Sequence, residues 1–316
     1  MLTNRRELGV DNRTTTAKVS RRAVMAAALL IPLAGCAPIV EEAKPTATPK
    51  PTPLPTQNAA DDFAALEAQY GARLGVFAID PKTSWTLEYR ADERFAFCST
   101  FKALAAGAVL GRRSIPELEE VVTYTSDDLV SHSPITEQNV ETGMTIRELC
   151  DAAVRYSDNT AANLLFADLG GPAALTAILR EQGDRVTQLD RAETDLNSAV
   201  PGDPRDTSSP RALAESLGRY AIGDALPADK RDILNDWLNA NTTGDTLIRA
   251  ALPPGWKAGD KTGAGAFGTR NDIAIVYPPG DTPISIAIMS SKADPDAAYD
   301  DALIAAAARV VLTAAS

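Results

Sequence analysis

Apolar residues recur at two different spacings along this chain of 316 residues. Where they lie three or four positions apart they indicate one face of an α-helix, and where they alternate or run together they indicate β-strands. Gly and Pro residues separate these segments. The helical spacing predicts helices over residues 99–110, 145–156, 160–169, 172–181, 210–220, 229–239 and 299–312, preceded by a helix carrying Phe63, Leu66 and Tyr70.

The strand pattern occurs only near the two ends of the folded part of the chain. It predicts strands over residues 74–79, 85–89, 257–262, 272–277 and 284–290. Because no helix separates consecutive late strands, we expect an antiparallel sheet, completed by a hairpin of the first two strands. The predicted class is α/β (α+β): an antiparallel sheet covered by the terminal helices, an all-helical lobe, and a ligand site in the cleft between them.

The first 57 residues differ in composition from the rest. Ser20-Arg21-Arg22 is a twin-arginine pattern, and the apolar run that follows is too short to span a bilayer. The run ends in Leu33-Ala34-Gly35-Cys36, which is similar to a bacterial lipobox and implies cleavage before Cys36 and lipidation of its thiol. An ordinary signal peptide with a coincidental cysteine is the alternative.

These features predict the organisation of the chain. We expect a signal peptide over residues 1–35, a Pro/Thr-rich extended linker over 36–57 and one domain over 58–316. Within the domain, the sheet lobe takes about 58–96 and 241–316, and the helical lobe about 97–240. The expected location is the cell envelope, on the outer face of a membrane or in a periplasm-like space, with membrane contact only through the lipid on Cys36.

Charge and histidine content exclude several kinds of function. The formal net charge of −11 argues against a nucleic-acid surface and against broad adhesion to anionic lipid. The single histidine, His132, excludes a zinc hydrolase built on several histidines, and we expect it in a polar loop at the surface or the cleft edge. A Ser-His-Asp triad would have to use His132 alone. We expect neither a metal nor another cofactor.

The first candidate for chemistry is the pair Ser99 and Lys102. Residues three apart share a helix face, so the hydroxyl and the amine are expected one turn apart near a helix start. A serine hydroxyl needs a base to become a good nucleophile, and a partly desolvated lysine can be that base. The pair alone is a weak signal, since most Ser-x-x-Lys sequences are exposed helix faces.

Three further short motifs follow this pair, and together the four are far more specific than any one of them. Taken singly they could be a helix cap, a solvated loop charge and an exposed strand lysine. In order they are Ser157-Asp158-Asn159 at a helix end, Glu193-x-x-Leu196-Asn197 in an irregular stretch, and Lys261-Thr262-Gly263 on a predicted strand.

With these motifs the chain resembles a class A serine β-lactamase over about residues 60–316. The likeness extends to Ser133-Pro134-Ile135-Thr136, to Asp206-Thr207 and to residues 251–256. The leader is similar to those of some lipoprotein β-lactamases of high-GC Gram-positive bacteria. The resemblance implies a monomer that hydrolyses small β-lactam antibiotics and binds no nucleic acid.

The resemblance also implies a role for each reacting group. Ser99 would attack the lactam carbonyl while Lys102 holds or removes its proton. The backbone amides of Ser99 and Ala264 would form the oxyanion hole. Ser157 would pass a proton to the departing lactam nitrogen. Glu193 would activate the water that cleaves the acyl-enzyme, and whether it also serves acylation stays open.

Further residues are implied to bind the substrate or to support the site. Asn159 would orient Lys102 and the substrate amide, and Asn197 would help Glu193 to position the water. An Ω-loop over about residues 186–206 would be pinned by Arg191 and Asp206, with a cis peptide bond between Glu193 and Thr194. The remaining substrate-binding residues are Lys261, Thr262, Gly263, Arg270 and His132.

The cysteines depart from the family. Its frequent disulfide would need a cysteine at Ala106 to pair with Cys150, and the disulfide of several carbapenem-hydrolysing relatives would join Cys98 to a cysteine at Gly265. Both partners are missing, so we expect two buried thiols and no bridge.

Two other functions share part of this pattern. A DD-peptidase or penicillin-binding protein has the Ser-x-x-Lys, Ser-x-Asn and Lys-Thr-Gly motifs but lacks the Glu193 loop. A β-lactam sensor that stays acylated, or a ligand-binding lipoprotein, is an interpretation from another class. The presence of both Glu193 and Asn197 argues against these alternatives.

Overall fold

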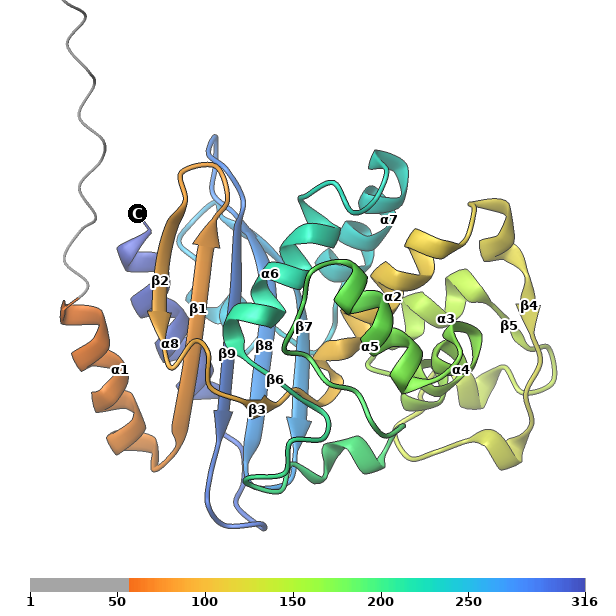
Figure 1. Ribbon diagram of the computed structural model, residues 1–316, viewed down its shortest axis with the longest axis horizontal. Helices are drawn as coiled ribbons and strands as arrows, with labels where there is room; N and C mark the ends of the chain where they lie inside the picture. The colour runs from red at the N-terminus through yellow and green to blue at the C-terminus, as the bar shows by residue number, and fades with distance from the viewer. Residues whose placement is uncertain (1–56, 316) are drawn as a thin grey trace, which may run out of the picture. The chain divides into compact units, whose positions relative to one another are not determined.

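A five-stranded antiparallel sheet organises residues 57–315, which are the residues that the computed structural model describes. The strand order is β2-β1-β9-β8-β7, so the N-terminal hairpin pairs with the last strand and completes the sheet as expected (Figure 1). The predicted leader and nearly all of the linker lie outside the described residues. The strands are β1 (Arg73–Asp80), β2 (Trp85–Tyr89), β7 (Lys257–Gly265), β8 (Thr269–Tyr277) and β9 (Ile284–Ser291).

Two helices from opposite ends of the chain cover one face of the sheet: α1 (Gln57–Tyr70) and α8 (Asp301–Ala314) (Figure 1). Phe63 and Ile304 are fully buried with sheet residues such as Val76. Burial of such side chains is worth about 1.5–3 kcal/mol each. This apolar layer therefore fixes the sheet from behind and leaves its other face to the remaining helices.

The other helices pack on the opposite face and beyond it, around the buried helix α2 (Figure 1). Residues from Phe101 to Leu110 of α2 are all buried, and small side chains let its neighbours approach closely. At Gly107 a Cβ atom would lie 2.7 Å from the ring of Tyr220, so a larger residue would push α6 away. The helices are α2 (Phe101–Arg112), α3 (Ile146–Arg155), α4 (Asn159–Leu169), α5 (Pro172–Glu181), α6 (Pro210–Ala221) and α7 (Ala228–Asn239).

The observed elements differ from the predicted ones in two ways. The structure adds two short strand pairs, β3 (Phe95–Ala96) with β6 (Thr207–Ser208) and β4 (Val121–Val122) with β5 (Met144–Thr145), which are too short to show an alternating pattern. Strands β7 and β8 also extend three residues further toward each other than predicted. Ladder pairing holds these residues in the sheet although their sequence is rich in Gly and polar residues.

Within residues 57–315, no single helix is long and apolar enough to cross a membrane. Only the sharply bent pair of α4 and α5 reaches such a length and composition when its two helices are taken together.

Candidate active site

Ser99 lies just ahead of α2, in a 3₁₀ turn over Cys98–Thr100. The regular helix begins at Phe101, two residues later than predicted, and Cys98 adopts a left-handed backbone conformation with φ 47°. This turn lies against strand β7. Ser99 is 8% exposed, so little of it can be reached by solvent.

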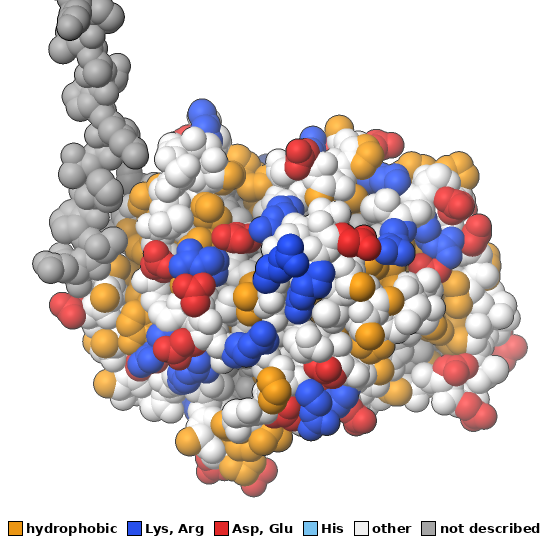
Figure 2. Space-filling model, in the orientation of Figure 1, with side chains coloured by type: hydrophobic (Ala, Val, Ile, Leu, Met, Phe, Trp, Pro, Cys, Tyr) orange, Lys and Arg blue, Asp and Glu red, His pale blue; other side chains and the backbone are white. Residues whose placement is uncertain are grey.

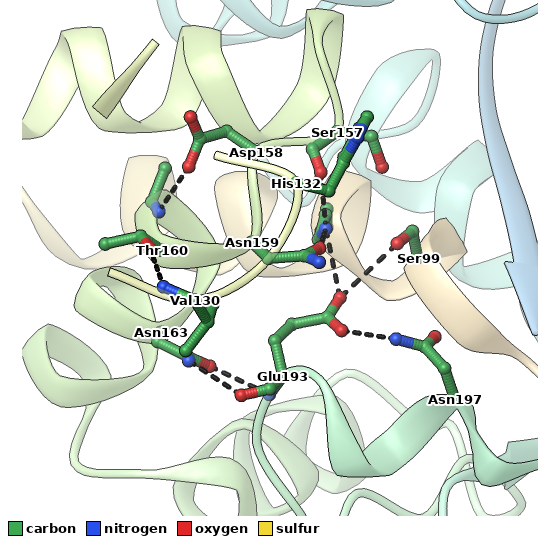
Figure 3. Close-up of polar contacts among 12 residues, drawn as sticks. Ser99, Val130, His132, Ser157, Asp158, Asn159, Thr160, Asn163, Glu193 and Asn197 are labelled. Carbon is green, nitrogen blue, oxygen red and sulfur yellow. Dashed lines mark hydrogen bonds and ion pairs between the residues drawn. The ribbon is translucent and has the colours of Figure 1, made fainter. Parts of the chain in front are cut away.

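Ser99 and Lys102 converge on one oxygen of Glu193. The Ser99 hydroxyl donates to Glu193 Oε1 over 3.3 Å, and Lys102 Nζ lies 3.0 Å from the same oxygen (Figure 3). Lys102 also donates to the backbone oxygen of Ser157 over 2.8 Å and to Asn159 Oδ1 over 2.5 Å. All three ammonium donors of a fully buried lysine therefore have acceptors.

Burial lowers the pKa of the Lys102 ammonium, and the negative charge of Glu193 opposes that shift. The other carboxylate oxygen of Glu193 accepts a 2.5 Å hydrogen bond from Asn197 Nδ2 (Figure 3). A buried lysine with a lowered pKa, close to a serine hydroxyl, can act as the base that the hydroxyl needs.

Asn163 holds the backbone of Glu193 and was not singled out from the sequence. Its amide accepts from Glu193 N over 2.8 Å and donates to Glu193 O over 2.9 Å (Figure 3). Asn163 follows Asn159 by four positions on α4, so the two amides share a helix face. The four-residue spacing from Asn159 could have suggested that Asn163 faces the site, but nothing near Asn163 in the sequence indicates that Glu193 is its partner.

The Ser157-Asp158-Asn159 segment connects α3 to α4 and fixes one wall of the site. Ser157 has φ 58°, while Asp158 caps α4 by accepting from Ala161 N over 2.8 Å. Asn159 donates to the backbone oxygen of Ser131 over 2.8 Å. The three residues therefore differ in what they do: Ser157 is held in a strained conformation, Asp158 caps a helix and Asn159 binds Lys102.

His132 is exposed, and its ring nitrogen Nε2 lies 3.2 Å from the backbone oxygen of Tyr156. Its own backbone oxygen accepts from Asn159 N over 3.0 Å. The loop that carries His132 thus borders the site, and contact of its side chain with a substrate stays a prediction.

Strand β7 brings Lys261, Thr262 and Gly263 to the same place. A Cβ atom on Gly263 would lie 2.8 Å from the backbone oxygen of Phe97 and 3.2 Å from Ser99 N, so only glycine allows this approach. Ala264 follows directly on the same strand, and its amide remains the predicted second donor of an oxyanion hole.

Lys261 is fully buried close to a second lysine. Burial, reinforced by the positive charge of Lys102, lowers the pKa of the Lys261 ammonium to about 7. The neighbouring Thr262 shares a 2.6 Å hydrogen bond between hydroxyls with Thr243. Lys261 therefore changes its charge near neutral pH.

Arg270 on β8 reaches α8 rather than Thr262. Its Nε donates to Asp301 Oδ1 over 2.7 Å, and its guanidinium lies over the ring of Tyr299. These contacts hold an arginine with little exposure next to the β7 motif in the sheet. The other guanidinium N–H groups of Arg270 have no hydrogen-bond partner among residues 57–315.

A buried cluster of acidic groups lies behind Lys261, and the sequence reasoning missed it. Arg249 Nε lies 2.5 Å from Asp260 Oδ1, and Asn241 donates to the other Asp260 oxygen over 2.7 Å. Burial raises the pKa of the Asp272 carboxyl well above its usual range, and the charge of Asp260 adds to the shift. Asp272 Oδ1 accepts no hydrogen bond from the described part of the chain, and Asp260 Oδ1 has Arg249 as its ion-pair partner, so a proton on Asp272 fits the surroundings of both carboxyls.

The loop that carries Glu193 is pinned as expected. Arg191 Nε donates to Asp206 Oδ2 over 2.6 Å, and Asp206 Oδ1 accepts from the backbone amides of Asp190 and Arg191. The Glu193–Thr194 peptide bond is cis, as predicted. Cys98 and Cys150 are free and buried, which confirms the expectation of no bridge between them.

Comparison with known proteins places this arrangement in a family. A model described as the β-lactamase enzyme family matches residues 58–315. A β-lactamase of Amycolatopsis lactamdurans is 56% identical over 85% of this chain and 88% of its own length. The chain belongs to the class A serine β-lactamases.

Two solved structures show the same fold. A class A β-lactamase from Clostridium kluyveri is 51% identical with a TM-score of 0.80, covering 81% of this chain and 98% of that one. A halotolerant bacterial β-lactamase is 55% identical with a TM-score of 0.79, covering 80% and 97%. The predicted class, an antiparallel sheet with terminal helices and a helical lobe, is therefore confirmed for this class A β-lactamase.

Proposed function

We propose that this serine β-lactamase opens the lactam amide of β-lactam antibiotics through an ester on Ser99 that Glu193 helps water to cleave. The observation that carries the proposal is the convergence of Ser99 Oγ and Lys102 Nζ on Glu193 Oε1. A nucleophile, a buried amine and a carboxylate within hydrogen-bond reach are the parts that acylation followed by hydrolysis requires.

In the acylation step, the Ser99 oxygen forms a bond to the lactam carbonyl carbon as the neutral form of Lys102, which its lowered pKa favours, takes the hydroxyl proton. The backbone amides of Ser99 and Ala264 stabilise the developing oxyanion, and one such donor is worth about 3 kcal/mol. The carbon–nitrogen bond then breaks, and the nitrogen receives a proton through the Ser157 hydroxyl. The backbone oxygen of Ser157 accepts from Lys102, so this residue lies beside the lysine.

In the deacylation step, Glu193 takes a proton from water as the water oxygen attacks the ester carbon. The bond from that carbon to Ser99 Oγ then breaks, and Ser99 Oγ receives the proton back from Glu193, its hydrogen-bond partner. The 2.5 Å hydrogen bond from Asn197 holds the carboxylate itself, and the two hydrogen bonds between the Asn163 amide and the Glu193 backbone hold the residue that carries it. General-base catalysis contributes about 10² to 10⁴ in rate when the base is positioned in this way.

Substrate binding is assigned to the opposite wall of the site. Lys261, Thr262 and Arg270 would hold the carboxylate of the antibiotic, beside Gly263, whose missing side chain lets β7 approach Ser99. Arg270 is oriented by Asp301 and keeps other donors for a ligand. A carboxylate is the partner that such a group of cations favours.

Turnover of a chromogenic cephalosporin tests the proposal against its alternatives. Continuous hydrolysis that Ser99→Ala abolishes supports the β-lactamase mechanism. A single stoichiometric burst indicates a sensor that stays acylated, and slow turnover with cleavage of a D-Ala-D-Ala peptide indicates a DD-peptidase. Ser99→Ala also checks that the colour change depends on the proposed nucleophile.

We also propose, from the sequence of the leader, that the protein is exported and anchored by a lipid on Cys36, and, from its family, that it is a monomer. The twin-arginine and lipobox patterns support this proposal. Mass spectrometry of protein extracted from membranes should find an N-terminal Cys36 carrying acyl chains. Loss of membrane attachment in Cys36→Ser, with export unchanged, is the matched control.

A further inference from the structure

A second cavity lies behind the Ω-loop and contains none of the residues assigned to catalysis. Its volume is about 690 Å³, within the range of small-molecule sites. One wall is the loop segment from Ala199 to Arg205, and the other walls come from the start of β1, from β3 and from the end of β9. Figure 2 shows basic side chains beside apolar ones on the lower part of this face.

Four cationic side chains line this cavity, and two of them have no acidic partner. Arg73 is paired with Glu93, and Arg205 with Asp203. Arg94 donates only to the hydroxyl and backbone oxygen of Thr207.

Lys292 has no ion pair or side-chain hydrogen bond with any part of residues 57–315. The cavity therefore carries two uncompensated positive charges in a protein whose formal net charge is −11. Such a local excess favours an anion.

A buried hydroxyl at the same cavity also lacks a partner. Thr269 lines the cavity and is 1% exposed, and its Oγ1 makes no hydrogen bond within the described residues. Successive side chains of a strand point to opposite faces, so Thr269 points away from the α8 face that its neighbour Arg270 reaches. A buried hydroxyl without a partner is unfavourable, and an oxygen-bearing ligand that reaches it would supply the missing partner.

Apart from Asp203, Thr207 and Ser291, the rest of the lining is apolar or glycine and belongs mostly to the Ω-loop. Val200 is 48% exposed, and Pro201, Pro204 and Phe95 lie around the cavity with it. An inorganic ion would leave this apolar surface in water. A ligand with one anionic group and one apolar group would cover both kinds of lining.

We propose that this cavity binds a small organic anion, with a carboxylate or phosphate near Arg94, Lys292 and Thr269 and an apolar group against the loop. The ligand joins residues 199–205 to the end of β9 and so restrains the loop that carries Glu193. The effect on deacylation rests on the proposed function, whereas the binding site does not.

A titration followed by ¹⁵N NMR locates the site directly. Phenyl phosphate and phenylacetate, each added at fixed ionic strength, should shift amides of residues 199–205 and 291–293 and should saturate. Whichever of the two ligands gives the stronger shifts identifies the preferred anionic group, phosphate or carboxylate. Shifts confined to the cleft around Lys261, or no saturable shifts at all, would overturn the proposal.

Charge variants make the test specific. Lys292→Gln should weaken binding about three- to tenfold, since one charged contact at a partly exposed site is worth about 1 kcal/mol. Thr269→Val should weaken binding as well. Lys257→Gln removes an exposed lysine at the far end of β7 and should leave the affinity unchanged. Equal affinity in Lys292→Gln and Lys257→Gln contradicts the assignment.

Amide hydrogen exchange tests the link to the loop. Saturating ligand should slow exchange over residues 190–206 in the wild-type protein and have less effect in Lys292→Gln. Binding without slower exchange contradicts the restraint of the loop. Because neither readout needs turnover, failure of this inference can be told apart from failure of the proposed hydrolysis.

Discussion

Lys102 Nζ lies 3.0 Å from Glu193 Oε1, and both side chains are completely buried. A buried ion pair stabilises a protein only when further hydrogen bonds satisfy its remaining donors and acceptors. Here the backbone oxygen of Ser157 and the side chain of Asn159 accept hydrogen bonds from the lysine, and Asn197 donates one to the carboxylate. The pair is therefore a fixed acid–base unit, and its two members can be separated by mutation.

The first prediction concerns which member acts as the base for acylation. Glu193→Gln removes the charge that opposes the effect of burial, so the pKa of Lys102 should fall further. The acid limb of the acylation rate should then move to lower pH while acylation itself persists. Stopped-flow measurement of ester formation across pH checks this.

A matched variant decides between the two bases. Lys102→Ala should slow acylation by about 10² to 10⁴, which is the usual contribution of a positioned base. If Glu193→Gln slows acylation as much as Lys102→Ala does, the carboxylate rather than the lysine is the base for that step.

The second prediction concerns the alkaline limit of substrate binding. With a pKa of about 7, Lys261 loses its charge in the free enzyme as pH rises above neutrality. The KM for a carboxylate-bearing penicillin should therefore rise above about pH 7, while kcat changes little because bound substrate restores the proton. Steady-state kinetics from about pH 6 to 9 measure this.

Lys261→Arg is the control for the rise in KM above neutral pH, since a guanidinium stays charged from about pH 6 to 9. The alkaline rise in KM should disappear in the variant, even if its KM is higher at every pH. A wild-type KM that is flat above neutrality would show that the charge of Lys261 is not what binds the substrate.

The third prediction separates the two carboxyls of the buried cluster. Asp272→Asn keeps the shape of a protonated acid and should not lower the free energy of unfolding at neutral pH. Asp260→Asn leaves Arg249 without its buried partner and should cost about 2–4 kcal/mol. Urea denaturation of both variants gives the comparison.

The pH dependence of these variants has a definite sign. Folded Asp272 keeps a proton that the unfolded chain loses above about pH 4, so this residue lowers wild-type stability as pH rises. Asp272→Asn removes that loss, so its stability relative to the wild type should increase as pH rises above about 4. A difference that is constant with pH, or that favours the wild type at higher pH, contradicts the proton on folded Asp272.

The fourth prediction concerns the Ω-loop. Arg191→Ser removes the ion pair with Asp206, but Asp206 keeps two backbone donors. The cost in global stability should be about 1–2 kcal/mol. Hydrogen exchange over residues 190–206 should increase, and relative rates for different β-lactams should change more than stability does. Unchanged exchange in the loop would mean that the ion pair does not restrain it.

Local patterns in the sequence predicted most of the fold and the reacting groups. The spacing of Ser99 and Lys102 and the apolar faces of the helices depend on neighbours three or four positions away, which a single sequence displays. The hairpin and the late strands were predicted for the same reason. Their ends were not, because β8 begins with the polar residues Thr269, Arg270 and Asn271 and yet is buried.

Those polar residues are buried because their partners lie far away in the sequence. Asn271 donates to the backbone oxygens of Ala96 and Phe97, about as distant in sequence as any contact of the site. Asn163 finds Glu193 in the same way, thirty residues along the chain. Spacing cannot reveal such contacts, so Asn163 and Asn271 were missed, although the reacting groups and the two amides beside them, Asn159 and Asn197, were found.

The most direct test of the mechanism is the mass of the protein after it meets a penicillin. In Glu193→Ala the nucleophile, Lys102 and the oxyanion donors remain, so the Ser99 ester should form and then persist, because deacylation loses about 10² to 10⁴ in rate. Intact mass spectrometry should show one stoichiometric adduct in Glu193→Ala and none in Ser99→Ala. Turnover of a good penicillin by Glu193→Ala at the wild-type rate would contradict the account, because the carboxylate would then have no part in deacylation.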